Sequence, residues 1–89
     1  MSPENYLNHP TFGLLSSVCI LEENRQLFTT LYAQRLFFLV TTSPDGLEFE
    51  PLGRVEARLL MENHLRRLRR NGQQNEYAKL QDTYKRTFP

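Results

Sequence analysis

Residues 26–42 limit most strongly what this chain can fold into. They are dominated by Phe, Leu, Val, Thr and Tyr, and no Gly or Pro interrupts them. Such side chains fit the pleated, half-buried surface of a sheet. The stretch is too long for one average strand, and Ala33-Gln34-Arg35 is the only polar break in its middle. We therefore predict two antiparallel strands, over residues 27–32 and 36–42, joined by a tight connection at this break.

The second of these strands must bury both of its faces. Residues 36–40 (Leu-Phe-Phe-Leu-Val) are apolar at five successive positions. Because neighbouring side chains on a strand point to opposite faces, neither face is polar here. We expect the second face to be covered either by another part of the chain or by a partner protein.

The segments before this hairpin also favour extended structure. Residues 2–10 are rich in turn-forming side chains, and we interpret them as an arm that lies along the body of the domain. Residues 11–23 are predicted to form a strand, with Gly13 as a bulge or a point of close approach.

The segment after the hairpin predicts one more strand. Ser43-Pro44-Asp45-Gly46 has the composition of a turn. Residues 47–50 then alternate apolar and acidic side chains, which is typical of a strand with one face in water. Glu48 and Glu50 would lie about 7 Å apart on that face, and we interpret them as a solvated acidic pair. Pro51 and Gly53 are expected to end the strand.

These segments predict an α+β, mainly β fold. Four or five short antiparallel strands in about 50 residues avoid exposed edges by curling into a small barrel. The candidates are an SH3-like or Tudor-like barrel and an OB-fold, and the short length favours the former.

The periodicity becomes helical after Gly53. Ala57, Leu60, Met61, Leu65 and Leu68 follow helical spacing, with His64 beside them, and Asn71-Gly72 supplies a stop. A second helix is expected over residues 73–87, with an apolar stripe of Tyr77, Leu80, Tyr84 and Phe88. So short a connection predicts a helical hairpin. We expect two domains, a barrel over residues 1–53 and a hairpin over residues 54–89.

The charge distribution supports this division. Residues 1–53 hold two basic and six acidic side chains, a net charge of −4, whereas residues 54–89 hold nine basic and four acidic side chains, a net charge of +5. The two parts therefore either attract each other or address different surfaces.

No catalytic or metal-binding pattern is present. His9, His64 and Cys19 lack ligand spacing, and the four Gly residues form no phosphate-binding loop. We expect no enzymatic activity, cofactor or metal. The single Cys19 permits no internal disulfide, which fits a reducing cytoplasm, and we interpret it as a buried structural thiol. The sequence has neither a signal peptide nor a membrane span, so we expect no membrane association.

Two kinds of binding surface remain as alternatives. The basic cluster of Arg58, Arg66, Arg67, Arg69 and Arg70 suggests contact with nucleic-acid phosphates, or else a helix end stabilised by cations with Glu62 paired to Arg66. The aromatic residues suggest either a cage for methylated lysine or, as we prefer, core and protein-interface roles. A cage would draw on Tyr6, Phe12, Tyr32, Phe37 and Phe38.

The chain resembles the PipX family of cyanobacterial proteins along essentially its whole length. The resemblance is carried by residues 4–15 (Glu-Asn-Tyr-Leu-Asn-His-Pro-Thr-Phe-Gly-Leu-Leu), by residues 27–42 and by the ending at 84–88 (Tyr-Lys-Arg-Thr-Phe). It implies a Tudor-like barrel followed by two helices. Ser16-Ser17 and the turn after residues 18–21 look less typical of the family.

The resemblance implies a non-enzymatic regulatory adaptor. At low 2-oxoglutarate the trimeric PII signalling protein would hold the chain through its T-loops. At high 2-oxoglutarate the chain would be released to act as coactivator of the dimeric transcription activator NtcA, with no direct DNA contact. The resemblance places the shared partner-binding face at Tyr32, Gln34, Arg35, Leu36 and Phe38, with Tyr6 and Phe12 beside it. Arg69, Arg70 and the helices would serve contacts with NtcA, PII or a further transcription regulator.

Overall fold

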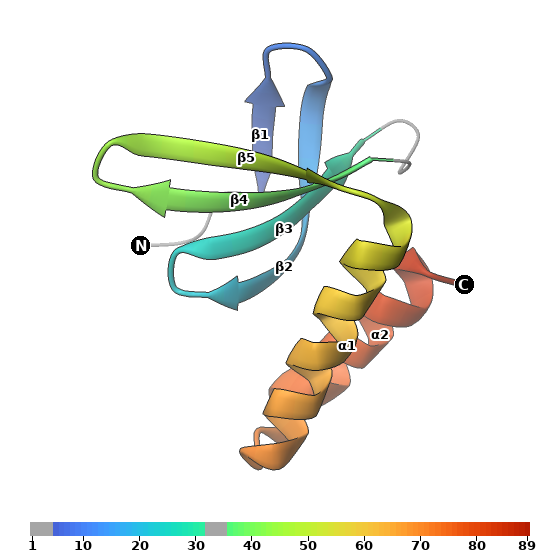
Figure 1. Cartoon of the computed structure of the whole chain (residues 1–89). Coiled ribbons are helices and arrows are strands. Elements are labelled where there is room, and N and C mark those ends of the chain that lie inside the picture. Colours follow the sequence, from blue (N-terminus) through green and yellow to red (C-terminus); the bar gives the residue numbers. More distant parts are fainter. Residues whose placement is uncertain (1–4, 32–35) are drawn as a thin grey trace. The chain divides into compact units, whose positions relative to one another are not determined.

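The computed structural model describes residues 5–31 and 36–89, which divide into two compact units, Met1–Arg54 and Val55–Pro89 (Figure 1). The first unit is a curled, five-stranded antiparallel sheet, and the second is a pair of helices. The strands are β1 (Tyr6–His9), β2 (Gly13–Glu22), β3 (Arg25–Thr30), β4 (Phe37–Ser43) and β5 (Gly46–Leu52), and the helices are α1 (Arg54–Arg70) and α2 (Gln74–Thr87).

The strands follow one another in the sheet in chain order, and each pairs antiparallel with the next. The predicted α+β fold, a small curled β-domain followed by two helices, is therefore confirmed. The central hairpin is confirmed as well, since β3 pairs with β4 from Arg25 opposite Thr41 to Thr29 opposite Phe37. Its predicted connection at Ala33-Gln34-Arg35 lies outside the described residues.

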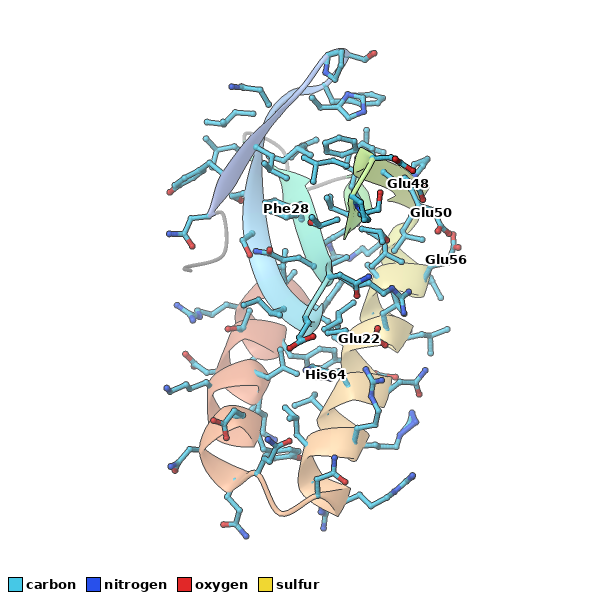
Figure 2. All side chains as sticks on the ribbon, turned by 90° about the vertical axis from the view of Figure 1, so that its left-hand side faces the viewer. Glu22, Phe28, Glu48, Glu50, Glu56 and His64 are labelled. Atoms are coloured by element: carbon cyan, nitrogen blue, oxygen red, sulfur yellow. The ribbon has the colours of Figure 1, made fainter. Side chains whose placement is uncertain are left out.

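The apolar run of β4 is buried on both faces, as its composition predicts. Phe37, Phe38, Leu39 and Val40 are each 6% exposed or less. Phe38 and Val40 belong to a core cluster with Leu15 and Phe28, and Leu7 and Phe49 pack against this cluster. Figure 2 labels Phe28 within the sheet. Because side chains alternate along a strand, Phe37 and Leu39 lie on the opposite face.

The structure corrects the expected role of Gly13. This residue opens β2 with a φ of +75°, so it is the left-handed residue of the turn after β1. The register of β2 against β3 shifts instead between Ser17 and Cys19 and between Ile20 and Glu22. An extra residue on one strand bends it and increases its twist, which helps a small sheet to curl.

Two expectations for the outer strands were incomplete. The N-terminal arm is in part a true strand, because β1 pairs with β2 from Tyr6 opposite Ser16 to His9 opposite Gly13. Pro51 does not end the last strand; it lies within β5, opposite Phe38. A proline is tolerated there because β5 is an edge strand, with a neighbour on one side only.

The turn between β4 and β5 agrees with the prediction. Ser43 pairs with Gly46, which has a φ of +125° that only glycine adopts readily. The Ser43 hydroxyl accepts a hydrogen bond from the Asp45 amide at 3.3 Å and donates one to the Gly46 carbonyl at 3.2 Å. Beyond the turn, the carboxylates of Glu48 and Glu50 point away from the sheet, as Figure 2 shows.

The helical unit has the boundaries that its periodicity predicts. α1 buries Ala57, Met61 and Leu68, and α2 buries Leu80. α1 ends at Asn71-Gly72, where Gly72 has a φ of +72° and the Gln73 amide donates to the Leu68 carbonyl at 2.9 Å. A left-handed glycine with this backbone hydrogen bond is a common helix stop.

A side-chain hydrogen bond connects the two helices. The Tyr84 hydroxyl on α2 donates to Glu62 Oε2 on α1 at 2.5 Å. The expected pairing of Glu62 with Arg66 is wrong, because Arg66 Nη1 donates instead to Asn63 Oδ1 at 3.0 Å. In the described part of the chain, neither helix combines the length and the apolar character needed to cross a bilayer.

Candidate protein-interaction site

Four of the seven residues predicted to bind partners lie in the described part of the chain. These four are Tyr6, Phe12, Leu36 and Phe38. The other three, Tyr32, Gln34 and Arg35, fall outside the described residues. The flanking strands in the described part of the chain are β3, which ends at Thr30, and β4, which begins at Phe37.

Leu36 is held through its backbone, while its side chain is exposed. Its carbonyl accepts one hydrogen bond from the Thr30 amide at 3.1 Å and another from the Thr29 hydroxyl at 2.9 Å. Thr29 is only 3% exposed, so this second bond satisfies a buried hydroxyl. The Leu36 side chain is 38% exposed. The central hairpin therefore fixes the position of Leu36 and leaves its side chain available.

Phe38 lies beneath the surface rather than on it. Its side chain is 1% exposed and belongs to the core cluster. Its ring contacts the ring of Phe12 with centroids 5.5 Å apart and that of His9 with centroids 5.0 Å apart. Phe38 therefore supports the aromatic residues of the turn after β1 from below.

Phe12 combines exposure with fixed packing. Nearly half of its side chain is exposed, although its ring rests on Phe38 and on His9, whose centroid lies 5.1 Å away. An aromatic ring that is both ordered and solvent-accessible loses little conformational freedom when a partner covers it. We name Phe12 and Leu36, together with the Phe38 ring beneath, the rim surface.

Sequence reasoning missed the contribution of His9. Its Nδ1 accepts hydrogen bonds from the backbone amides of Thr11 at 3.0 Å and Phe12 at 3.2 Å. Its ring also lies 5.2 Å from the ring of Phe49 on β5. The only sequence signal was the turn-forming Asn-His-Pro-Thr composition around it, which says nothing about contacts with β4 and β5.

Tyr6 faces away from the core cluster. It is 57% exposed, and its neighbour Leu7 packs against the cluster. Because adjacent strand residues point to opposite faces, Tyr6 lies on the outer face of β1 and Phe38 on the inner face of β4. A partner that contacts both Tyr6 and the rim surface would have to reach around the β1 edge of the sheet.

The structure argues against an aromatic cage that includes both Phe37 and Phe38, while Tyr32 lies outside the described residues. Phe37 and Phe38 would both have to line it, but they point to opposite faces of β4 and are 0% and 1% exposed. A cage needs several accessible rings around one cation. Because consecutive residues on a strand cannot share one pocket, Phe37 and Phe38 have the core role that we preferred from the sequence.

Cys19 lies on β2 and His64 on α1, and neither is part of the rim surface. Cys19 is only partly buried, and desolvation of its thiol raises the pKa from its ordinary value of 9.0 to about 12, which favours the protonated form. His64 lies on α1, where its Nδ1 is 3.2 Å from Arg67 Nη2. Within residues 5–31 and 36–89, no group of His, Cys, Asp and Glu side chains is arranged to hold a metal ion.

The arginines of α1 form an exposed basic surface. Arg58, Arg66, Arg67, Arg69 and Arg70 are all exposed, and the last three also stabilise the C-terminal end of the helix dipole. A shallow hollow at this end of the hairpin is lined by Arg69, Gln74, Tyr77 and Ala78.

Comparison with known proteins agrees with the sequence resemblance. None of the curated proteins matches this chain. A family model described as PipX, the PII-interacting protein X, matches residues 3–88 of the 89 residues. The match covers both the curled sheet and the helical pair, so it is not confined to a shared small β-domain. On this evidence the chain belongs to the PipX family of PII-interacting regulatory proteins.

Proposed function

We propose that this protein is a regulatory adaptor that exchanges between two partners according to the carbon and nitrogen state of the cell. At low 2-oxoglutarate the PII signalling protein holds it. At high 2-oxoglutarate PII releases it, and it then acts as a coactivator of the transcription factor NtcA. The single observation that carries this proposal is the family match over residues 3–88.

The proposed binding face is built on the central hairpin and the turn after β1. Phe12 and Leu36 contribute exposed apolar side chains, and Phe38 supports Phe12 from beneath. Tyr and Arg are enriched among the residues that carry most of the energy of an interface. The proposed face consists of Tyr6, Phe12, Tyr32, Gln34, Arg35 and Leu36, with Phe38 beneath it as a support.

Partner exchange on one such face needs only modest energies. Truncating one dominant interface residue typically costs about 2 kcal/mol or more, which is roughly thirtyfold in affinity. The adaptor itself need not sense 2-oxoglutarate, because a ligand that changes the affinity of either partner shifts the exchange.

The experiment that tests the proposal measures binding of the purified chain to PII, first with ADP and then with ATP plus 2-oxoglutarate. We expect binding in the first condition and its collapse in the second. Binding to NtcA should show the opposite dependence on 2-oxoglutarate. Failure to bind PII in both conditions would contradict the proposal.

Variants locate the face. Tyr32→Ala and Phe12→Ala should each weaken binding to both partners while leaving the far-UV circular dichroism unchanged. Leu47→Ala is the matched control, because Leu47 on β5 is 45% exposed and Phe12 is 46% exposed. Equal affinity of Phe12→Ala and Leu47→Ala would exclude Phe12 from the face.

A second candidate function, direct binding to nucleic acid, is favoured by one observation. The exposed arginines Arg66, Arg67, Arg69 and Arg70 lie within five residues at the end of α1. If they contact phosphates, the affinity for duplex DNA should fall steeply with salt, with several counterions released. Weak binding with a shallow salt dependence would argue against phosphate contacts and would favour a role for these arginines in protein contacts.

A further inference from the structure

The turn that carries Phe12 is organised by one side chain. The imidazole of His9, at the end of β1, accepts hydrogen bonds at Nδ1 from two successive backbone amides, those of Thr11 and Phe12. A nitrogen that accepts a hydrogen bond carries no proton, so the ring proton of a neutral His9 is on Nε2. One side-chain atom therefore satisfies two amides in a turn that is otherwise exposed.

The same imidazole packs against three phenyl rings. Its ring centroid lies 5.1 Å from that of Phe12, 5.0 Å from that of Phe38 and 5.2 Å from that of Phe49. These distances fall in the range where aromatic pairs attract each other beyond simple burial. Because Phe38 and Phe49 belong to β4 and β5, His9 ties the turn to the far strands of the sheet.

Phe12 depends on both sets of contacts. Its amide donates to His9 Nδ1, and its ring packs against the imidazole and against Phe38. With 46% of its side chain exposed, burial alone does not fix the orientation of Phe12. The position of this exposed ring is therefore set by His9 together with Phe38.

We propose that His9 is a positioning residue for partner binding, which holds the Thr11–Phe12 turn and presents the Phe12 ring preorganised to the partner. This inference rests on the proposed function, since it requires Phe12 to contact a partner. Ordering one mobile side chain on binding costs an amount that corresponds to about two- to tenfold in affinity. His9 avoids that cost because the ring is already placed in the free protein.

The test separates the acceptor of His9 from its ring. His9→Phe keeps an aromatic ring but removes the Nδ1 acceptor, whereas His9→Asn keeps an acceptor at a similar position and removes the ring. Amide hydrogen exchange of Thr11 and Phe12 should speed up in His9→Phe. Affinity for ADP-bound PII should fall about two- to tenfold in His9→Phe and less in His9→Asn.

A double-mutant cycle with Phe12 distinguishes positioning from a general loss of structure. In a Phe12→Ala background, His9→Phe should cause no further loss of affinity for PII. An equal loss in both backgrounds, or wild-type affinity of His9→Phe, would overturn the inference. Wild-type affinity of Phe12→Ala would overturn it as well, because Phe12 would then not be a contact.

A measurement on the unmodified protein completes the test. The imidazole nitrogen spectrum should show His9 with its proton on Nε2, and slow exchange of the Thr11 and Phe12 amides should accompany it. A proton on His9 Nδ1 would overturn the inference, whether or not the protein binds PII. Loss of PII binding by the wild-type chain, with these signals present, would instead count against the proposed function alone.

Discussion

The ring of His9 on β1 meets the ring of Phe49 on β5 edge to face, with centroids 5.2 Å apart and planes at 86°. β1 and β5 are the two outer strands of the sheet and share no backbone ladder among the described residues. Side chains therefore bring the two edges of the curled sheet together at this end. A short β-domain can in this way cover part of its core without the hydrogen bonds of a closed barrel.

Phe49→Ala should lower the free energy of unfolding by about 2 kcal/mol. This is less than the roughly 3 to 5 kcal/mol of a fully buried Phe, because Phe49 is only half-buried and packs at the margin of the core cluster. Urea denaturation followed by circular dichroism measures the change. Leu47→Ala on the same strand is the control and should change stability by no more than about 0.5 kcal/mol. Equal effects of the two variants would show that the contact with β1 contributes nothing.

Thr29→Val should destabilise the protein by about 1 kcal/mol, although the two side chains have nearly the same shape. The substitution removes the hydroxyl that donates to the Leu36 carbonyl at 2.9 Å, and a typical net hydrogen bond contributes this amount. Thr30→Val is the control, since the contact of Thr30 with Leu36 is made by its backbone amide. If urea denaturation gave the same stability for both variants, the Thr29 hydroxyl would have no part in holding Leu36.

Tyr84→Phe should weaken the helical hairpin by about 1 kcal/mol, because it removes the hydrogen bond to Glu62 and keeps the ring contact with Phe88. Loss of helical circular dichroism on heating measures the effect. Tyr77→Phe on the same helix is the matched control and should have little effect. A double variant with Glu62→Gln should lose less than the two single losses combined, because both changes act on one hydrogen bond.

The same hydrogen bond predicts how Tyr84 responds to alkali. Donation to the Glu62 carboxylate, together with partial burial and the negative charge of Glu62, raises the pKa of the Tyr84 phenol. The stabilisation is therefore present below the pKa of an unfolded tyrosine and is lost as the pH rises past it. Ultraviolet absorbance should show a late tyrosine ionisation step, above the ordinary pKa of the phenol. In Tyr84→Phe this late step should be missing; its persistence would assign it to another tyrosine.

From Cys19 we expect a second loss of stability at high pH, separate from that of Tyr84. Its pKa rises from 9.0 to about 12 because burial disfavours the thiolate. The unfolded chain releases this proton near pH 9, whereas the native state keeps it. The part of the free energy of unfolding that depends on protonated Cys19 is thus fully present below about pH 9, and it declines as the pH rises towards 12. Between these values the wild-type stability should fall more steeply with pH than that of Cys19→Ala, and parallel slopes would contradict the burial of the thiol.

The secondary structure was largely readable from the sequence, because its signals are local. The apolar run of β4, the Ser43–Gly46 turn and the Asn71-Gly72 stop each depend on residues close together in the chain. The position of the bulges was not readable, since they arise from the register of β2 against β3. Pro51 was misjudged for a related reason, because only the strand order shows that β5 is an edge.

The candidate site was readable only in outline. Residue composition and family resemblance pointed to Phe12, Leu36 and Phe38, but Phe38 is buried and supports the surface from below. His9 was set aside because no histidine, cysteine or carboxylate stands at ligand spacing from it. Its partners are backbone amides and phenyl rings, which leave no motif in a sequence.

The sequence by itself determined the order and kind of the elements, because strand alternation, helical periodicity and turn chemistry act between near neighbours. Only the tertiary structure decided which rings meet, which carbonyl accepts a hydrogen bond from the Thr29 hydroxyl, and how the sheet edges come together. These contacts join residues far apart in the chain, and the curl of the sheet that creates them depends on its register and bulges. No local pattern encodes that curl, since it exists only once the strands have paired.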